Sequence, residues 1–431
     1  MGKSIYIATL IACAPVFASA QQADTLTLRE TISRVINTYP TVKQADEAVK
    51  SAGYQVKMAR AALLPVLNAS ASYMRVEPVA TVHFGDMDLS FEPNNNYQAG
   101  VSLTQLLYDF GKNRPKIEAA RQKEELAEMQ KLELYQNLAL NTVQMYYLNS
   151  FTREAIRIKR QQLSDYDEML RQAEVRAKSG SATSFDLLNT QVGQSGVKTQ
   201  LTELVATLNI QQRQLSILAD TVVLESVPLS THFEVQPNLM GLENLLNTAY
   251  ANRPEVQMAS KQIAIARLEE SAARRAYNPS LDLSASAGGK NGYPIHLDRM
   301  KLNYNAGVTL SIPLYEGGRR KQTVSLAQSA ANNAIFQKEL IEKQVHQQVS
   351  DIYYTLESDY NKMLQLQQQV NLARQAYQQA KVNYAAGTIT NLELLTSSTS
   401  LADSELQLLQ SRINYQIDYH KLQVSIGTPI W

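Results

Sequence analysis

The chain has 431 residues, with 41 basic and 40 acidic side chains and a net charge of +1. This length allows two or three ordinary domains or one large repeated unit, and the balanced charge gives no reason to expect nucleic acid as a partner. Only 17 glycines and 13 prolines interrupt the chain, which leaves room for long helices.

The first twenty residues, MGKSIYIATLIACAPVFASA, contain one lysine, an apolar run and a small-residue end. This pattern predicts a secretory signal peptide over residues 1–20 that is cleaved before Gln21. The only cysteine, Cys13, lies within it, so the mature chain would have no disulfide or thiolate metal site. Alternatively, the segment from Leu10 to Cys13 is a lipobox, and Cys13 is lipidated. After this segment the sequence contains no stretch of 18 apolar residues, so it predicts no transmembrane helix there.

Beyond this segment the chain repeats itself. Landmarks recur in the same order 207 to 214 residues later: Pro40 and Pro65 as Pro254 and Pro279, and Gly180 in KSGSATSFDLLNTQ as Gly387 in AAGTITNLELLTSS. Ordered landmarks at a nearly constant offset indicate an internal duplication. We predict two structural repeats, 21–221 and 240–431, joined by a linker at 222–239 that lies outside the main body with the short helices.

Each repeat contains two predicted strands, at about 66–76 and 97–108 in the first and about 280–288 and 303–313 in the second. Apolar and small polar residues alternate along them, as in LNASASY from Leu67 to Tyr73. This alternation suits a membrane barrel with lipid outside and water inside. It suits equally a soluble antiparallel sheet with one buried face.

A passage from strand to helix occurs twice, as LYDFGKN and LYEGGRR. The glycines of these joints, Gly111, Gly317 and Gly318, give the backbone freedom to turn. We expect the cations of the joints to lie near inner lipid headgroups, the alternative being a solvated charge cluster. These cations are Lys112, Arg114, Arg319, Arg320 and Lys321. Because cations at a helix start oppose the helix dipole, we expect compensation from outside the joint.

Long helices follow each joint, at about 114–178 and 184–218 and again at about 319–386 and 391–425. Between Val345 and Tyr384, twelve positions step alternately by four and three residues, and all are apolar except Asp359. Such a heptad seam is typical of a coiled coil and would be roughly 58 Å long. The predicted fold class is therefore mainly α with a small β part, built from long antiparallel coiled-coil hairpins and four strands per chain.

Four strands are too few to enclose a pore, because membrane barrels need about eight. If the strands span a membrane, several copies must share one barrel. The sequence thus predicts a homo-oligomer without fixing the number of copies.

Taken together, these segments resemble the outer membrane efflux protein family, the TolC-like outer membrane factors. The resemblance runs from about Leu26 to the C-terminus and is carried by LTLRETISRVINTYPTVKQA, the two joints and the two hairpin tips. It implies a homotrimer, with twelve strands in an outer-membrane β-barrel and twelve long helices in a periplasmic α-barrel. It also implies an exit channel for efflux or secretion, surrounded by outer-membrane lipid. Its partners would be a periplasmic adaptor protein and an inner-membrane transporter.

The tips would dock the adaptor and hold the gate. The docking residues are Gly180, Ser181, Gly387 and Thr388. The family has inward aspartates in an LDVLD-like stretch, which is LELLT here, so Glu393 matches the first acidic position and Thr396 replaces the second. A ring of Glu393 side chains would favour cations.

Both tip carboxylates also have a simpler explanation. Thr183-x-x-Asp186 and Thr390-x-x-Glu393 are capping boxes, and for Asp186 a cap is the preferred role. Neither carboxylate needs a gate to account for it.

The sequence offers nothing for catalysis. It has no phosphate-binding loop, nucleophile elbow or dinucleotide fingerprint, and its five histidines lack ligand spacing: His83, His232, His296, His346 and His420. We therefore expect no enzyme activity, cofactor or metal. Two alternatives stay open: a protein secretion channel rather than a drug or metal efflux channel, and a periplasmic coiled-coil scaffold that never enters a membrane.

Overall fold

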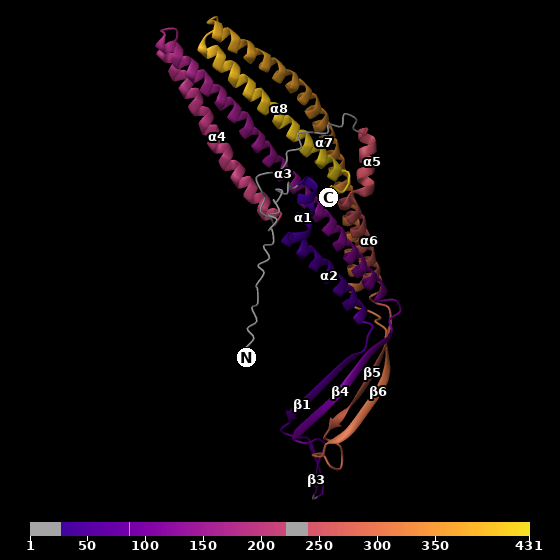
Figure 1. The fold of residues 1–431 in the computed structure, drawn as a ribbon. Coiled ribbons are helices and arrows are strands. Elements are labelled where there is room, and N and C mark those ends of the chain that lie inside the picture. Colours follow the sequence, from indigo (N-terminus) through magenta and orange to yellow (C-terminus); the bar gives the residue numbers. More distant parts are fainter. Residues whose placement is uncertain (1–26, 86, 221–239) are drawn as a thin grey trace, which may run out of the picture.

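The computed structural model describes residues 27–220, except residue 86, and residues 240–431. The predicted signal peptide and the linker at 222–239 lie outside the described residues. The molecule is elongated, with a sheet at one end and the tips of two helical hairpins at the other (Figure 1).

Apart from β2 and β3, which occur only in the first half, both halves of the described chain follow the same order of elements. The first half comprises α1 (Leu28–Thr38), α2 (Pro40–Ala61), β1 (Val66–Arg75), β2 (Thr81–Phe84), β3 (Met87–Ser90), β4 (Asn95–Tyr108), α3 (Arg114–Lys178) and α4 (Ser184–Leu218). The second comprises α5 (Leu242–Asn252), α6 (Pro254–Arg275), β5 (Ser280–Lys290), β6 (Lys301–Ser311), α7 (Arg319–Ala386) and α8 (Asn391–Ser425). Pro40 and Pro254 open α2 and α6, where a missing backbone N–H costs nothing.

The four long strands form one antiparallel sheet in the order β1-β4-β5-β6. Its register places apolar residues in rows across the sheet, such as Ala69, Val101, Ala287 and Tyr304. The neighbouring row is small and polar: Ser70, Gly100, Gly288 and Asn303. One face of the sheet is therefore apolar and the other polar, and the predicted fold class is confirmed.

A second, smaller sheet departs from the expected polar loop between the first two long strands. β2 and β3 pair antiparallel, with Thr81 opposite Ser90. Each strand has only four residues, too few for an alternating pattern to stand out in the sequence. The described part of the chain thus has six strands, of which four form the main sheet.

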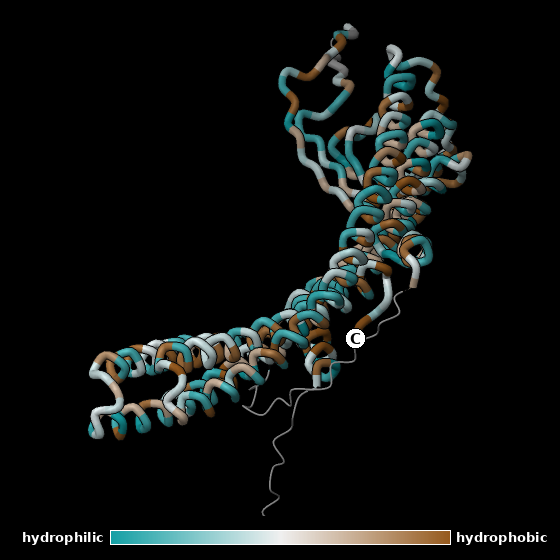
Figure 2. Tube along the Cα trace, turned by 90° about the horizontal axis from the view of Figure 1, so that it is seen from above, coloured by the Kyte–Doolittle hydropathy of each residue, from teal (hydrophilic) through white to brown (hydrophobic). Residues whose placement is uncertain are grey.

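The helices form a curved wall of neighbours. Near the tips, contacts run in the order α4, α3, α8, α7, and near the sheet in the order α2, α3, α6, α7 (Figure 1). Figure 2 shows polar and apolar residues interspersed along these helices. Every helix of the described residues is too short or too polar to act as a membrane span.

The predicted seam of α7 lies in the core. Nine of its twelve positions are buried: Val345, Val349, Leu356, Met363, Leu366, Val370, Tyr377, Ala380 and Tyr384. The equivalent stretch of α3 buries polar residues as well, including Asn149, Thr152 and Lys159. The ammonium of Lys159 donates to Oε1 of Gln162 at 3.0 Å and lies 3.8 Å from the carboxylate of Asp403 on α8. The two hairpins therefore meet along a partly polar contact.

Candidate functional site

Both hairpin tips turn by the same backbone motif. Gly180 and Gly387 have φ angles of +73° and +76°. The N–H of Ser181 donates to the carbonyl of Arg176 at 2.8 Å, and the N–H of Thr388 donates to that of Asn383 at 3.0 Å. This is the bonding of a Schellman motif, which favours glycine in the left-handed position.

The carboxylates beside the tips both cap helices. The Thr183 N–H donates to Asp186 Oδ2 at 3.0 Å, and the Thr390 N–H donates to Glu393 Oε2 at 2.7 Å. The hydrogen bonds from the Thr390 backbone and hydroxyl hold the pKa of Glu393 below its ordinary value. Glu393 is exposed and therefore ionised at neutral pH.

Thr396 is exposed too, and its hydroxyl donates to the carbonyl of Leu392 at 2.8 Å. Glu393 and Thr396 thus both make hydrogen bonds at the start of their own helix, α8.

Four contacts that sequence analysis did not identify join the two tips. The guanidinium of Arg176 stacks on the ring of Tyr384, and its Nη2 donates to the carbonyl of Ala385 at 2.8 Å. The amide of Asn391 donates to the Asp186 carbonyl and to the Thr190 hydroxyl, both at 2.9 Å. These contacts tie α3 to α7 and α4 to α8. The available signal was the placement of Arg176 and Tyr384 in the last turns before the two tip glycines.

From the tips inward, the hairpins share an apolar cluster that includes Tyr166, Tyr377, Tyr384 and Leu394. The Tyr166 hydroxyl lies 3.2 Å from that of Thr399. This packing is buried, as is the hydrogen bond between Asn391 and Thr190, whereas the hydrogen bond of Arg176 to Ala385 is exposed. The hairpins are therefore joined at the tips by buried as well as exposed contacts.

The strand–helix joints contain their own compensating charges. In the first, the Asp109 carboxylate accepts from the N–H groups of Gly111 at 2.9 Å and Asn113 at 2.7 Å. In the second, Glu316 accepts from Nη2 of Arg319 at 2.6 Å. Each joint thus supplies compensation of its own through the acidic residue just before its glycines, and compensation from outside the joint stays a prediction.

The joint glycines have backbone angles that other residues rarely adopt. Gly111, Gly317 and Gly318 have φ angles of +78°, +59° and +80°. Within the described ranges 27–220 and 240–431, no group of three or more His, Cys, Asp or Glu side chains is placed so that it could hold a metal ion.

Comparison with known proteins adds a family and a fold. The profile of the family described as "Outer membrane efflux protein" matches residues 31–219 and 245–428. The alkaline protease secretion protein AprF of Pseudomonas aeruginosa is 24% identical over 87% of this chain and 79% of its own. The outer membrane protein TolC of Escherichia coli K12 is 24% identical over 96% of this chain and 84% of its own. A solved membrane protein from Pseudomonas aeruginosa superposes with a TM-score of 0.79 at 20% identity, covering 93% of each chain.

Proposed function

The chain belongs to the outer membrane efflux protein family, and we propose that it is the exit channel of a three-part export system. It is an outer-membrane protein whose long helices lie in the periplasm. The partners would be a periplasmic adaptor and an inner-membrane transporter, which deliver substrate to the tips. The observation that carries this proposal is the open sheet, which has one apolar face and two unpaired edges.

The two edges of the protomer are built from different elements. One side consists of β1, α2 and α4, and the other of β6 and α7. Apolar side chains are exposed on both edges, among them Phe185, Leu188 and Val192 on α4 and Tyr354, Leu372 and Val382 on α7. Unlike edges that meet head to tail close into a ring when the rotation between successive copies divides a full turn. We propose that β1 of each copy pairs with β6 of the next.

The number of copies follows from the family resemblance, which implies a trimer with twelve strands. In this arrangement the apolar face of the sheet contacts lipid, and the polar face lines the pore. The two halves of the chain, 21–221 and 240–431, would act as structural repeats that each contribute two strands and one long hairpin to the wall.

Engineered cysteines test the shared barrel. With Cys13 replaced by serine, Ala306→Cys on β6 is combined with either Ala69→Cys or Ala71→Cys on β1. Oxidation in outer-membrane fractions should produce covalent dimers and trimers. The matched control is Ala285→Cys with Ala306→Cys, because these two residues pair within one chain. The proposal fails if both edge pairs, like the control, yield only monomers.

At the tips we propose a gate. Opening would move α7 and α8 away from α3 and α4 when the adaptor docks at Gly180, Ser181, Gly387 and Thr388. Two features support this: the Arg176 hydrogen bond across the tips is exposed, and α7 packs against α8 along its own buried seam. Glu393, ionised and exposed, would form an anionic ring at the constriction; Thr396 would leave that ring single, and Asp186 would serve as a cap.

The substrate class separates two versions of this function. The first is efflux of small molecules or metals. The second is protein secretion, which the similarity to the alkaline protease secretion protein AprF favours. Deleting the gene and measuring both drug or metal susceptibility and the secreted proteins distinguishes them. Recovery of the chain as a soluble periplasmic monomer would instead support the scaffold alternative and contradict the channel.

A further inference from the structure

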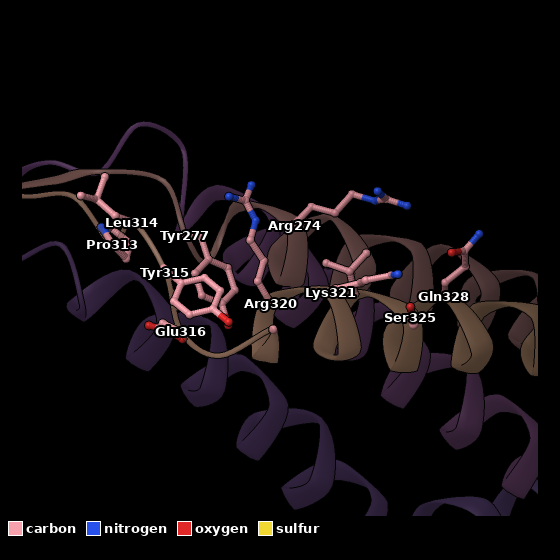
Figure 3. Close-up of a pocket in the computed structure, with 12 residues that line it drawn as sticks. Arg274, Tyr277, Pro313, Leu314, Tyr315, Glu316, Arg320, Lys321, Ser325 and Gln328 are labelled. Carbon is pink, nitrogen blue, oxygen red and sulfur yellow. The ribbon is translucent and has the colours of Figure 1, made fainter.

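A cavity of about 410 Å³ lies where the second sheet-to-helix joint meets the end of α6. Its walls come from three segments: Arg274 at the end of α6 with Tyr277 in the turn after it, Leu314 and Tyr315 in the joint, and Arg320 and Lys321 in the first turn of α7. Figure 3 shows Arg320 beside the rings of Tyr277 and Tyr315, with Lys321 farther along α7.

One side of this cavity continues the apolar face of the sheet. On β6 the exposed apolar residues include Tyr304, Val308 and Leu310, and Ile312 follows in the same alternation. Leu314 comes two residues later and is 91% exposed, next to Tyr315 at 86%. Leu281 and Leu283 of β5 pair with Leu310 and Val308, so the apolar surface is two strands wide. It leads directly to the mouth of the cavity.

The other side of the cavity is positively charged. Two of its charged residues are already paired: Arg274 forms a 2.6 Å ion pair with Glu270, and Glu316 forms a 2.6 Å ion pair with Arg319. The guanidinium of Arg320 lies 5.3 Å from the centre of the Tyr277 ring. Across the described residues, no carboxylate lies within 4.0 Å of Arg320 or Lys321. Two cations therefore lack an acidic partner at the end of an apolar surface.

This arrangement matches a single kind of ligand, an amphiphile with an anionic head. We propose that the cavity binds the phosphate-bearing headgroup of a lipid in the inner leaflet of the outer membrane. The acyl chains lie along the apolar face of β5 and β6, and the phosphate receives hydrogen bonds from Arg320 and Lys321. Tyr277 and Tyr315 occupy the interfacial depth at which aromatic rings are favourable.

The lipid would have a mechanical role. The joint is the point at which a strand surrounded by lipid continues as a helix surrounded by water. A headgroup held by α7 and the joint would fix the depth of the second repeat in the membrane. This inference rests on the proposed function, because it requires β5 and β6 to span the outer membrane.

The test compares two double variants on the same helix. Arg320→Gln with Lys321→Gln removes the two unpartnered cations. Lys338→Gln with Lys343→Gln is the matched control, since it removes two cations that pair with Glu342 and Glu339. These control positions lie roughly 26 to 33 Å farther along α7, well beyond the headgroups.

The readout is the melting temperature of the purified oligomer in nanodiscs of phosphatidylcholine, with and without phosphatidylglycerol. We expect phosphatidylglycerol to raise the melting temperature of the wild type and the control, and this shift to be lost in Arg320→Gln/Lys321→Gln. Arg320→Lys, which keeps the charge, should retain most of the shift. Inorganic phosphate added to phosphatidylcholine discs should not reproduce it, since the apolar surface would stay without acyl chains.

The outcomes separate the site from the channel. An equal lipid shift in the cation variant, no shift in the wild type, or a full shift with inorganic phosphate overturns the lipid site. Conductance in planar bilayers is measured on the same samples. A variant that conducts normally but has lost the lipid shift supports both proposals, whereas a wild type that neither inserts nor conducts removes the channel and the lipid site together.

Discussion

The guanidinium carbon of Arg176, in the last turn of α3, lies 4.4 Å from the ring centre of Tyr384, in the last turn of α7. The same guanidinium donates a hydrogen bond to the carbonyl of Ala385. One side chain of the first hairpin thus holds the end of the second. If the hairpins separate when the channel opens, this contact must break.

Replacing Arg176 should therefore favour the open channel. An exposed cation–π contact contributes about 0.5–1 kcal/mol and a hydrogen bond about 1 kcal/mol. Arg176→Gln should shift the opening equilibrium of one copy roughly tenfold, which single-channel recording measures as open probability. Arg171→Gln is the control, because Arg171 pairs with Glu168 of its own helix. Equal open probability in the two variants would exclude Arg176 from the gate.

The negative charge of Glu393 can be removed while its capping hydrogen bond at the start of α8 is kept. Glu393→Gln keeps an oxygen that accepts from the Thr390 N–H and removes the negative charge. We expect a weaker preference for cations in planar bilayers, and no change for Asp186→Asn, which alters the equivalent cap of α4. Unchanged selectivity in Glu393→Gln would take this residue out of the pore lining.

The lowered pKa of Glu393 adds a pH dependence to the same experiment. Its carboxylate stays ionised as the pH falls to the ordinary range of a glutamate. Cation preference should thus persist through that range and disappear only at lower pH. A loss of preference at higher pH would point to another carboxylate.

Close approach of β4 and β5 depends on Gly288. A Cβ atom at this position would lie 2.3 Å from the carbonyl oxygen of Ala99 and 2.6 Å from the Cα of Gly100. Gly288→Ala should push the strands apart at a cost of about 1–3 kcal/mol and reduce the heat-modifiable oligomer in outer-membrane fractions. Gly307→Ala on β6 is the control, since no atom lies within 4 Å of its added Cβ. Normal oligomer in Gly288→Ala would show that the sheet relaxes there.

Asp359 interrupts the apolar seam of α7 and makes stability depend on pH. Partial burial raises its pKa, and the neighbouring Asp418 carboxylate raises it further, while Lys362 and Lys421 oppose the shift. A carboxyl with a raised folded pKa stabilises the protein fully below its ordinary pKa and loses this contribution as the pH rises through the folded value.

Asp359→Asn should remove that loss. The variant should be more stable than the wild type at pH 7, by at most about 1 kcal/mol because water screens the half-buried pair. The difference should shrink as the pH approaches 4, which thermal unfolding at several pH values measures. A variant that is less stable at pH 7 would mean that Asp359 acts chiefly as a hydrogen-bond partner.

The sequence predicts regular features better than local contacts. The α7 seam is periodic over forty residues, so its burial could be predicted, and the alternation in β1 and β4 gave the two faces of the sheet. The β2–β3 hairpin could not be predicted, because four residues carry too little pattern. The contacts of Arg176 and Asn391 depend on how the two hairpins lie side by side, which no local spacing encodes.

The joints illustrate an intermediate case. Their glycines were expected to turn the backbone, and the positive φ angles are present in the structure. The acidic residue before each glycine, Asp109 or Glu316, was visible in LYDFGKN and LYEGGRR, but its role as the compensating charge became clear only from its hydrogen bonds. Whether the cations meet lipid is tested by the nanodisc experiment.

The central claim is that several copies of this chain form one pore through the outer membrane. The most direct measurement is the current across a planar bilayer after addition of the purified wild-type oligomer. We predict discrete steps of ion current that become larger or longer-lived in Arg176→Gln. A membrane that stays electrically silent with both proteins, although they have inserted, would contradict the account.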